Sequence, residues 1–220
     1  MPLTLAIDCS LRLVNLGLGD EGCLLGEEGL DVGRKQSEVL PTAVESFLAR
    51  HGRALPNLGR IAVTVGPGYY TGIRVGLSYA TALAESLGIR VIPLNTLFVM
   101  AVPLLAPNRT VIPVVKARNG AVYAAAYANC TDSPGAIAES LPPAYFDLPD
   151  FFEALKKLGV TANETLIAGD DALVFEEIAS SGYLLDASAW TDGRSMLLAA
   201  AKIDPLDPAK IKAVYLRNPD

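Results

Sequence analysis

The 220-residue sequence has few of the residues on which metal binding and acid–base chemistry most often depend. It contains one histidine, His51, and three scattered cysteines, Cys9, Cys23 and Cys130. Histidine-pair zinc sites, HExxH motifs and two-histidine mechanisms are therefore excluded. A disulfide framework is not expected either, and the cysteine usage fits a reducing compartment. We predict that protein side chains alone hold no metal ion.

Long apolar runs and a surplus of basic residues are also missing. No run approaches the roughly 18 apolar residues that cross a bilayer, and the N-terminus lacks the basic start of a signal peptide. We therefore expect a cytoplasmic protein. The net charge is −6, whereas a chain that grips nucleic acid unaided usually carries a basic surplus. Any work on nucleic acid is expected to need a partner with a basic surface.

What the sequence does contain is the mixed pattern of an α/β protein. Short apolar segments separated by glycine-marked turns cover residues 3–27 and predict an antiparallel meander of strands. Apolar residues recur at helical spacing in Ser37–Arg50 and Thr71–Leu87, and the strand Ile61–Val65 lies between these segments. Because strands precede the first helix, the order is not that of a strict Rossmann fold. It predicts a sheet with helices packed against it.

The second half of the chain suggests the same coarse plan. A turn at residues 107–109 is expected to separate an N-terminal lobe, residues 1–106, from a smaller C-terminal α/β lobe, residues 107–220. Beyond the turn, apolar strands flank Asn119-Gly120, a dipeptide typical of tight hairpins. No internal repeat stands out at a fixed period. The order of elements nevertheless predicts an α/β fold in which the sheet and its helices are duplicated.

The segment TVGPGYYTGIRVG, residues 64–76, joins a predicted strand to a predicted helix. A glycine-rich turn before a helix N-terminus is a layout that binds phosphate in many proteins. Gly68, Thr71 and Arg74 are the candidate anion contacts, because Thr71 can cap the helix and Arg74 adds a charged donor. The lysine that a Walker loop carries after its last glycine is missing.

Asp8 ends the first predicted strand, and Ser10 follows it closely. A carboxylate and a hydroxyl at this position suit magnesium–phosphate chemistry, in which aspartate holds the ion and the next turn offers backbone N–H groups. The same two residue types also form ordinary hydrogen-bonded turns. Both interpretations of Asp8 and Ser10 remain open at the level of sequence.

The helix that follows the glycine-rich turn carries a stripe of small residues. Gly72, Gly76 and Ala80 recur every fourth residue and therefore lie along one helix face. Such a stripe lets another element approach closely and gain dispersion contacts along a long seam. The spacing favours helix packing over phosphate binding. It leaves open whether that packing is internal or between chains.

Several short motifs together resemble those of one family, TsaB, also called YeaZ. They match the family's AIDTS, HSE-x-L-P, GPGSFTGLRVG, DARxGEVYA and P-x-YLR patterns in order along nearly the whole chain. The matching segments are Ala6–Ser10, Ser37-Glu38, Leu40-Pro41, Gly66–Gly76, Ala117–Tyr123 and Val214–Arg217. The long glycine motif is highly specific, and the order of the others supports it.

The resemblance implies an actin/Hsp70/sugar-kinase-like (ASKHA) fold with two lobes, each a mixed β-sheet flanked by helices. It also implies an accessory role in making threonylcarbamoyladenosine next to the anticodon of tRNAs that read codons starting with A. A larger paralogue, TsaD, performs the transfer in that system, and a TsaE-like ATPase joins the complex. Contact with tRNA is expected only within the complex. ATP and magnesium are expected to be used by the partner subunits, so we expect no cofactor in this chain.

The resemblance places the contact with the paralogue on helices of the first lobe. The expected contact residues are Ser37, Glu38, Tyr69, Tyr70, Gly72, Ile73, Val75, Gly76, Tyr79, Ala80 and Leu83. Two tyrosines stand where the family has Ser-Phe, which adds amphipathic surface suited to partner contact. Gln36 stands where the family usually has histidine, and Lys116 where it has aspartate. The second change puts any ligand role of the hairpin in doubt.

Three functions remain open from the sequence. The first is a non-catalytic subunit that binds and activates the TsaD-like transferase. The second is a magnesium–nucleotide-binding enzyme of the same fold, with Asp8 on the ion, and the third is a homodimer through the same helices. TsaD-like proteins hold a metal with a histidine pair, so a chain with only His51 cannot be that enzyme. Protease activity lacks support for the same reason, because a serine or cysteine nucleophile needs a base.

Overall fold

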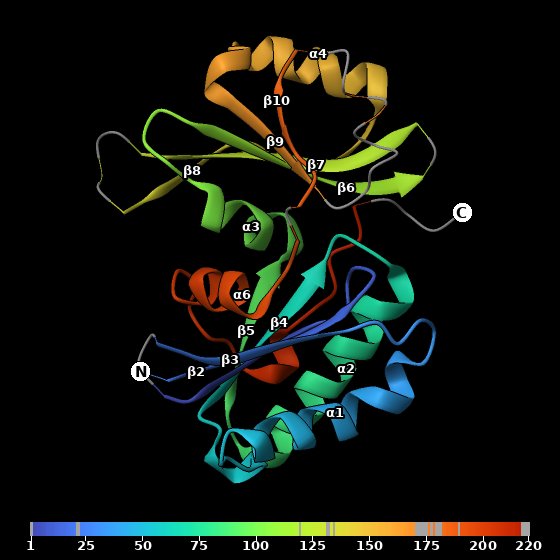
Figure 1. The fold of residues 1–220 in the computed structure, drawn as a ribbon, viewed down its shortest axis with the longest axis vertical. Coiled ribbons are helices and arrows are strands. Elements are labelled where there is room, and N and C mark those ends of the chain that lie inside the picture. The colour runs from blue at the N-terminus through green and yellow to red at the C-terminus, as the bar shows by residue number, and fades with distance from the viewer. Residues whose placement is uncertain are drawn as a thin grey trace. The chain divides into compact units, whose positions relative to one another are not determined.

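The computed structural model describes residues 2–20, 23–118, 120–130, 133, 135–169, 176, 178, 182–188 and 190–216 (Figure 1). Asn119 of the expected hairpin and Arg217 of the C-terminal motif lie outside the described residues. Within the described ranges, no helix is long and apolar enough to span a membrane.

The sheet of the first unit has five strands in the order β3-β2-β1-β4-β5. They are β1 (Thr4–Asp8), β2 (Val14–Asp20), β3 (Cys23–Leu30), β4 (Arg60–Gly66) and β5 (Arg90–Asn95). β1, β2 and β3 form the antiparallel meander that the glycine-marked turns predict. β4 pairs with β1 and β5 pairs with β4, both in parallel.

The sheet of the second unit has five strands in the order β10-β9-β6-β7-β8. They are β6 (Thr110–Arg118), β7 (Ala121–Asn129), β8 (Ile137–Asp147), β9 (Thr165–Gly169) and β10 (Leu184–Asp186). β6, β7 and β8 are antiparallel, whereas β9 and β10 extend the sheet in parallel. If the strands of the second sheet are counted from β6 as those of the first are counted from β1, the two sheets have the same strand order. The strand directions are also the same. The predicted α/β class with two mixed, helix-flanked sheets, the architecture that the resemblance implies, is confirmed.

The helices cover both faces of the first sheet. α1 (Gln36–Arg50) and α2 (Tyr70–Leu87) lie on one face, and α6 (Gly193–Ala200) lies on the other (Figure 1). α3 (Thr96–Ala101) follows β5, and α4 (Leu148–Leu158) packs on β7 and β8 of the second sheet. Short 3-10 helices lie at Leu55–Asn57, Val102–Leu104, Ala162–Glu164 and Pro208–Lys210.

The two compact units are not continuous in sequence. They consist of Met1–Val99 with Thr191–Val214, and of Met100–Trp190 with Tyr215–Asp220. The expected boundary at residue 106 differs from this division, mainly because the segment that holds α6 returns to the first unit. There α6 contacts β1, β2 and β3. The sequence pattern identifies a helix near this position but does not say which sheet it covers.

Strand β1 separates the side chains of the first unit into two layers, because successive strand residues point to opposite faces. Leu5 and Ile7 are fully buried beneath α1 and α2, where they join a core with Leu40 and Ala80. Each such side chain stabilises the fold by about 1.5–3 kcal/mol through its burial. Asp8 points to the opposite face, toward the segment that leads into α6.

Candidate functional site

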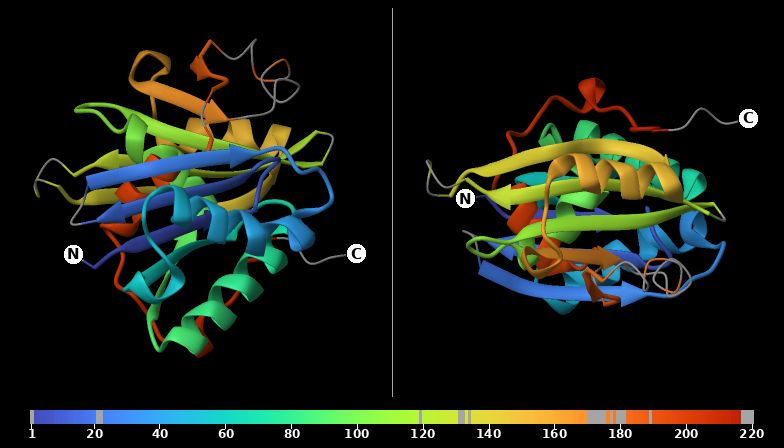
Figure 2. Two further views of the ribbon diagram at one scale, coloured as in Figure 1. Left: turned by 60° about the horizontal axis from the view of Figure 1, so that its bottom comes forward. Right: turned by 90° about the horizontal axis from the view of Figure 1, so that it is seen from above.

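A groove lies between α1 and α2 on the surface of the first unit. It has a volume of about 400 Å³ and mostly apolar walls. Its lining residues are Ser37, Leu40 and Pro41 of α1 and Tyr70, Thr71, Arg74, Val75, Ser78 and Tyr79 of α2. The two helices lie side by side on this face (Figure 2, left). We call this feature the α1–α2 groove.

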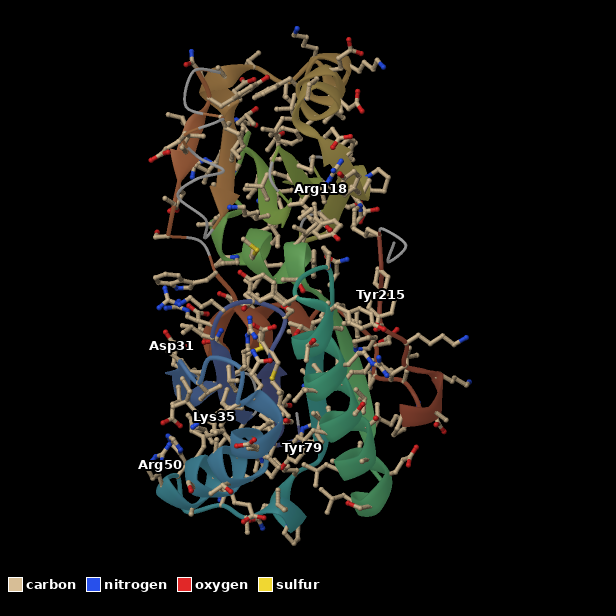
Figure 3. All side chains as sticks on the ribbon, turned by 90° about the vertical axis from the view of Figure 1, so that its right-hand side faces the viewer. Asp31, Lys35, Arg50, Tyr79, Arg118 and Tyr215 are labelled. Atoms are coloured by element: carbon tan, nitrogen blue, oxygen red, sulfur yellow. The ribbon has the colours of Figure 1, made fainter. Side chains whose placement is uncertain are left out.

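Tyr79 forms part of the wall between the two helices (Figure 3). Its side chain is half-buried. Burial raises the pKa of the Tyr79 hydroxyl, and the carboxylate of Glu45 on α1 raises that pKa further. The phenol therefore stays protonated at neutral pH and offers an O–H donor beside an apolar ring.

The start of α2 exposes two large aromatic side chains. Tyr69 is 55% exposed and Tyr70 is 48% exposed. The Arg74 guanidinium lies 5.3 Å from the centre of the Tyr70 ring and donates to the Tyr70 hydroxyl at 3.0 Å. Tyrosine and arginine are enriched where proteins bind one another. This end of the helix therefore has the composition of a binding surface.

The stripe of small residues on α2 points into the first unit. A Cβ atom on Gly72 would lie 1.9 Å from the Cys9 carbonyl oxygen, and one on Gly76 would lie 3.4 Å from the Cys9 Cβ and Sγ atoms. Ile73 is 2% exposed and Ala80 is 0% exposed. These four α2 residues pack the helix onto its own sheet. The stripe therefore packs internally, and contact of these four residues with a partner stays a prediction that their burial does not support.

The glycine-rich loop is filled by the protein's own backbone. Gly66 and Gly68 adopt φ values of 109° and 157°. A Cβ on Gly66 would lie 2.7 Å from the Val214 carbonyl oxygen, and one on Gly68 would lie 2.2 Å from the Ser10 carbonyl oxygen. The Tyr69 N–H also donates to the Ser10 carbonyl oxygen at 2.7 Å. Two neighbouring chain segments thus occupy the space beside Gly66 and Gly68. A phosphate-binding loop would need that space to be open.

Asp8 lies at the centre of a buried hydrogen-bond network. Its Oδ1 atom accepts from the backbone N–H and the hydroxyl of Ser10, at 2.9 and 2.6 Å, and from the Thr64 hydroxyl at 2.5 Å. Its Oδ2 atom accepts from the Asn15 amide at 3.5 Å and from the Thr191 hydroxyl. The Asp8 side chain is 0% exposed. The network ties together β1, β2, β4 and the segment before α6.

This network does not fit the magnesium ligand of the second hypothesis. A carboxylate has about four lone-pair sites, and donors of the first unit already occupy both oxygens of Asp8. Mg²⁺ also keeps several water molecules and needs an open site. Asp8 and Ser10 are interior, whereas Thr71 and Arg74 are exposed at the start of α2. Gly68 packs against Ser10, so the predicted anion contacts divide between a group in contact with the interior and the exposed Thr71 and Arg74.

The residues that a hydrolase would need are engaged elsewhere. Burial raises the pKa of the Cys9 thiol, and the charge of Asp8 raises it further, so the thiol is protonated and unreactive. The Nδ1 atom of His51 lies 2.8 Å from the Phe47 carbonyl oxygen, and the two rings pack edge to face at 4.8 Å. The only histidine in the sequence thus contacts α1 and not Cys9 or Ser10.

Comparison with known proteins places the chain in a family. A family model described as TsaD, tRNA N6-adenosine threonylcarbamoyltransferase, matches residues 31–186. The chain is 31% identical to the tRNA threonylcarbamoyladenosine biosynthesis protein TsaB of Bacillus subtilis, over 70% of this chain and 66% of that protein. The chain belongs to the TsaB/YeaZ family.

A second TsaB relative, from Escherichia coli, is 30% identical over 56% of this chain and 54% of its own length. The matched regions thus span just under two thirds and about half of these two relatives. A crystal structure of a protein similar to the peptidase YEAZ from Pseudomonas aeruginosa superimposes with a TM-score of 0.79. That comparison covers 99% of this chain and 100% of the other at 23% identity, and it shows a shared fold.

The other predicted contact residues of this TsaB/YeaZ family member keep accessible side chains. Ser37, Glu38, Tyr69 and Tyr70 are exposed, and Val75, Tyr79 and Leu83 are half-buried. Their contact with a partner stays a prediction. The sequence analysis missed Ser78, which lines the α1–α2 groove. Ser78 lies four residues after Arg74, so the sequence alone could have placed both on the same face of α2.

The sequence analysis also missed most members of the Asp8 network. The residues not recognised are Asn15, Thr64, Thr96 and Thr191. Thr64 and Asn15 were visible as polar residues inside apolar strand patterns, where a buried polar group needs a partner. Thr191 gave no such signal, because it lies 183 residues from Asp8.

The contrast between two glycines of α2 can be tested directly. Gly72→Ala should destabilise the protein by about 3 kcal/mol, because the new methyl group overlaps a backbone carbonyl that cannot move alone. Gly76→Ala is the matched control and should stay within about 1 kcal/mol of the wild type, since its methyl group has ordinary contacts and alanine favours helix. Urea denaturation measures both. Equal midpoints for the two variants would contradict the inward packing of Gly72.

Proposed function

We propose that the chain is an accessory subunit in the synthesis of threonylcarbamoyladenosine in tRNA. It binds a TsaD-like transferase through the α1–α2 groove and the exposed tyrosines at the start of α2, and binding activates that transferase. The modified adenosine lies next to the anticodon of tRNAs that read codons starting with A. The observation that carries the proposal is family membership together with an apolar, aromatic groove on the surface of one unit.

The chemistry of the groove supports a protein partner. Apolar walls, exposed tyrosines and an arginine held over one of them resemble the centre of a protein interface. Ser37 and Glu38 are exposed at the start of α1, where they add polar groups at the edge. Interfaces typically have such a polar rim around an apolar centre.

A non-catalytic role is part of the proposal. Asp8 has both carboxylate oxygens occupied, Cys9 is protonated and buried, and His51 packs on Phe47. These contacts support a chain whose polar interior holds the fold together. In the proposal the subunit works in the cytoplasm without a cofactor of its own, and the partner subunits use ATP and magnesium. A TsaE-like ATPase joins the complex, and tRNA contacts the chain only there.

The experiment combines depletion in cells with reconstitution. Depleting the protein should lower the threonylcarbamoyladenosine content of tRNA, measured by mass spectrometry of nucleosides, and the wild-type gene should restore it. The purified chain should form a complex with the TsaD-like protein of the same genome in light scattering. Unchanged nucleoside content after depletion would contradict the proposal, as would failure of the two purified proteins to associate.

A homodimer through the same helices is the second candidate assembly. The exposed fractions of Tyr69 and Tyr70 favour it, because a single chain leaves this aromatic surface uncovered. Since one surface cannot serve two partners at once, the TsaD-like protein should displace the second copy. The light-scattering titration of the reconstitution separates the two arrangements, because a homodimer through this surface should disappear as the heterodimer forms, whereas a homodimer through another surface should persist inside a larger assembly.

A further inference from the structure

After α6 the chain runs back to the glycine-rich loop. Residues 202–214, which we call the 202–214 strap, belong to the first unit, and the structure describes all of them. Near its beginning, Leu206 exchanges two backbone hydrogen bonds of 2.7 and 2.9 Å with Val91 of β5. Its 3-10 helix, Pro208–Lys210, packs on α2, and Ile211 packs against the core of the first unit (Figure 3). The strap thus connects β5 with α2.

The 202–214 strap ends against the glycine-rich loop. The Val214 N–H donates to the Val65 carbonyl oxygen at 2.7 Å. The Val214 carbonyl oxygen lies 2.7 Å from the position that a Cβ atom on Gly66 would take. Val65 is buried, and a buried backbone carbonyl group needs a hydrogen-bond donor. The end of the strap supplies that donor and packs on the first glycine of the loop.

The glycine-rich loop determines where α2 begins. Gly68 packs against the Ser10 carbonyl oxygen, and the Tyr69 N–H donates to the same oxygen at 2.7 Å. The bond that opens the helix runs from the Ile73 N–H to the Tyr69 carbonyl oxygen at 3.0 Å. Tyr69 occupies the N-cap, and tyrosine is not one of the residue types whose short side chains cap a helix. The start of α2 therefore depends on backbone contacts of the loop, with Ser10 on one side and Val214 on the other.

The 202–214 strap is more weakly packed than the helix that it adjoins. None of its residues is buried, and Leu206 is 39% exposed. On α2, by contrast, Ile73 is 2% exposed and Ala80 is 0% exposed. Segments with few buried apolar contacts open locally at a lower free energy than the whole protein unfolds. A docked and an undocked strap are therefore two states of one folded unit.

We propose that the docked 202–214 strap positions the start of α2 for the TsaD-like partner, so that undocking the strap weakens the binding of that partner. The inference rests on the proposed function, because the exposed Tyr69 and Tyr70 at this helix start belong to the proposed partner surface. The coupling is reciprocal: whatever docking of the strap adds to the partner's affinity, binding of the partner adds to docking of the strap.

Two variants at one position test the strap. Val214→Pro removes the N–H group that donates to Val65, whereas Val214→Ala is the matched control and keeps that group. In calorimetric titration Val214→Pro should bind the TsaD-like protein about tenfold more weakly, as expected for the loss of one backbone hydrogen bond. Val214→Ala should bind as the wild type does.

Hydrogen exchange in the isolated chain separates positioning from a general loss of stability. The Ile73 amide should exchange faster in Val214→Pro than in Val214→Ala, because the start of α2 is no longer held. The Val39 amide opens α1 in the same way, by donating to the Lys35 carbonyl oxygen at 3.0 Å, and its rate should not change. Equal rates for Ile73 in the two variants would overturn the proposal, and so would an equal increase at Val39.

The reciprocal effect is measured on the wild type and decides the matter if Val214→Pro does not fold. Binding of the TsaD-like protein should slow exchange of the Val214 amide. The Gly59 amide donates to the Leu3 carbonyl oxygen at 2.9 Å, directly before β4 and at the other end of that strand, and should keep its rate. An unchanged rate at Val214, or equal affinity of folded Val214→Pro and wild type, would overturn the role of the strap alone. A wild-type chain that does not bind the partner would overturn the proposed function as well.

Discussion

Asp8→Asn should destabilise the protein by at least about 3 kcal/mol, a large share of the 5–15 kcal/mol that stabilises a typical domain. The reason lies in the direction of the hydrogen bonds. Ser10, Thr64 and Thr191 all donate to the carboxylate. An asparagine amide would point two N–H donors at some of these groups, and the lost charge would weaken the remaining bonds. Urea denaturation followed by circular dichroism measures the loss.

Two controls make this result specific to the buried network. Asp31→Asn changes an exposed carboxylate that pairs with Arg12, and it should leave the urea midpoint nearly unchanged. Thr64→Val removes a single donor to Asp8 and should cost about 1 kcal/mol. Magnesium with ATP should not shift the wild-type midpoint, because a ligand that binds only the folded state would raise it. A wild-type midpoint for Asp8→Asn would refute the structural role of Asp8.

The repeated strand order was accessible from sequence because it follows from local signals. Glycine-marked turns separate the short strands of residues 3–27, and helical periodicity runs through Ser37–Arg50 and Thr71–Leu87. The structure places α1 and α2 within a residue of these ranges. Thr71 was expected to cap the second helix, but the helix begins one residue earlier and Tyr69 occupies the N-cap without a side-chain bond.

The contacts of the glycine motif could not be derived from its own residues. Gly68 and Gly72 are required by carbonyl groups of Ser10 and Cys9, which are about sixty residues away in sequence. A stripe of small residues reports that something approaches closely, but its identity depends on the tertiary fold. In this protein the approaching segment is the turn that directly follows β1. The sequence of such a motif therefore does not show whether the small residues face the protein's own core or a partner.

The division into units shows a similar limit. The chain leaves the first unit at Val99, within α3, several residues before the turn at residues 107–109 that composition identifies. The chain rejoins the first unit at Thr191, where the Thr191 hydroxyl bonds Asp8 and α6 packs against β2. Neither contact has a local pattern. Long-range polar networks of this kind are therefore recognised only when the fold is known.

Ser78→Arg should weaken binding of the TsaD-like partner by about 100-fold, which corresponds to about 2.8 kcal/mol. Ser78 is exposed and lines the α1–α2 groove. An arginine at this position fills the groove and places a charge against apolar walls, where an interface tolerates it poorly. Because Ser78 is not part of the core, the variant should fold like the wild type. Calorimetric titration with the partner measures the change.

A matched variant on the same helix isolates the groove from general effects of charge. Ser86→Arg makes the same substitution at an exposed position of α2 outside the groove, and it should bind as the wild type does. Tyr70→Ala removes a 48% exposed aromatic ring and should cost about 2 kcal/mol of binding, the size of an interface hot spot. If Ser78→Arg and Ser86→Arg bind equally well, the partner does not use the α1–α2 groove. The accessory role would then depend on another surface of the protein.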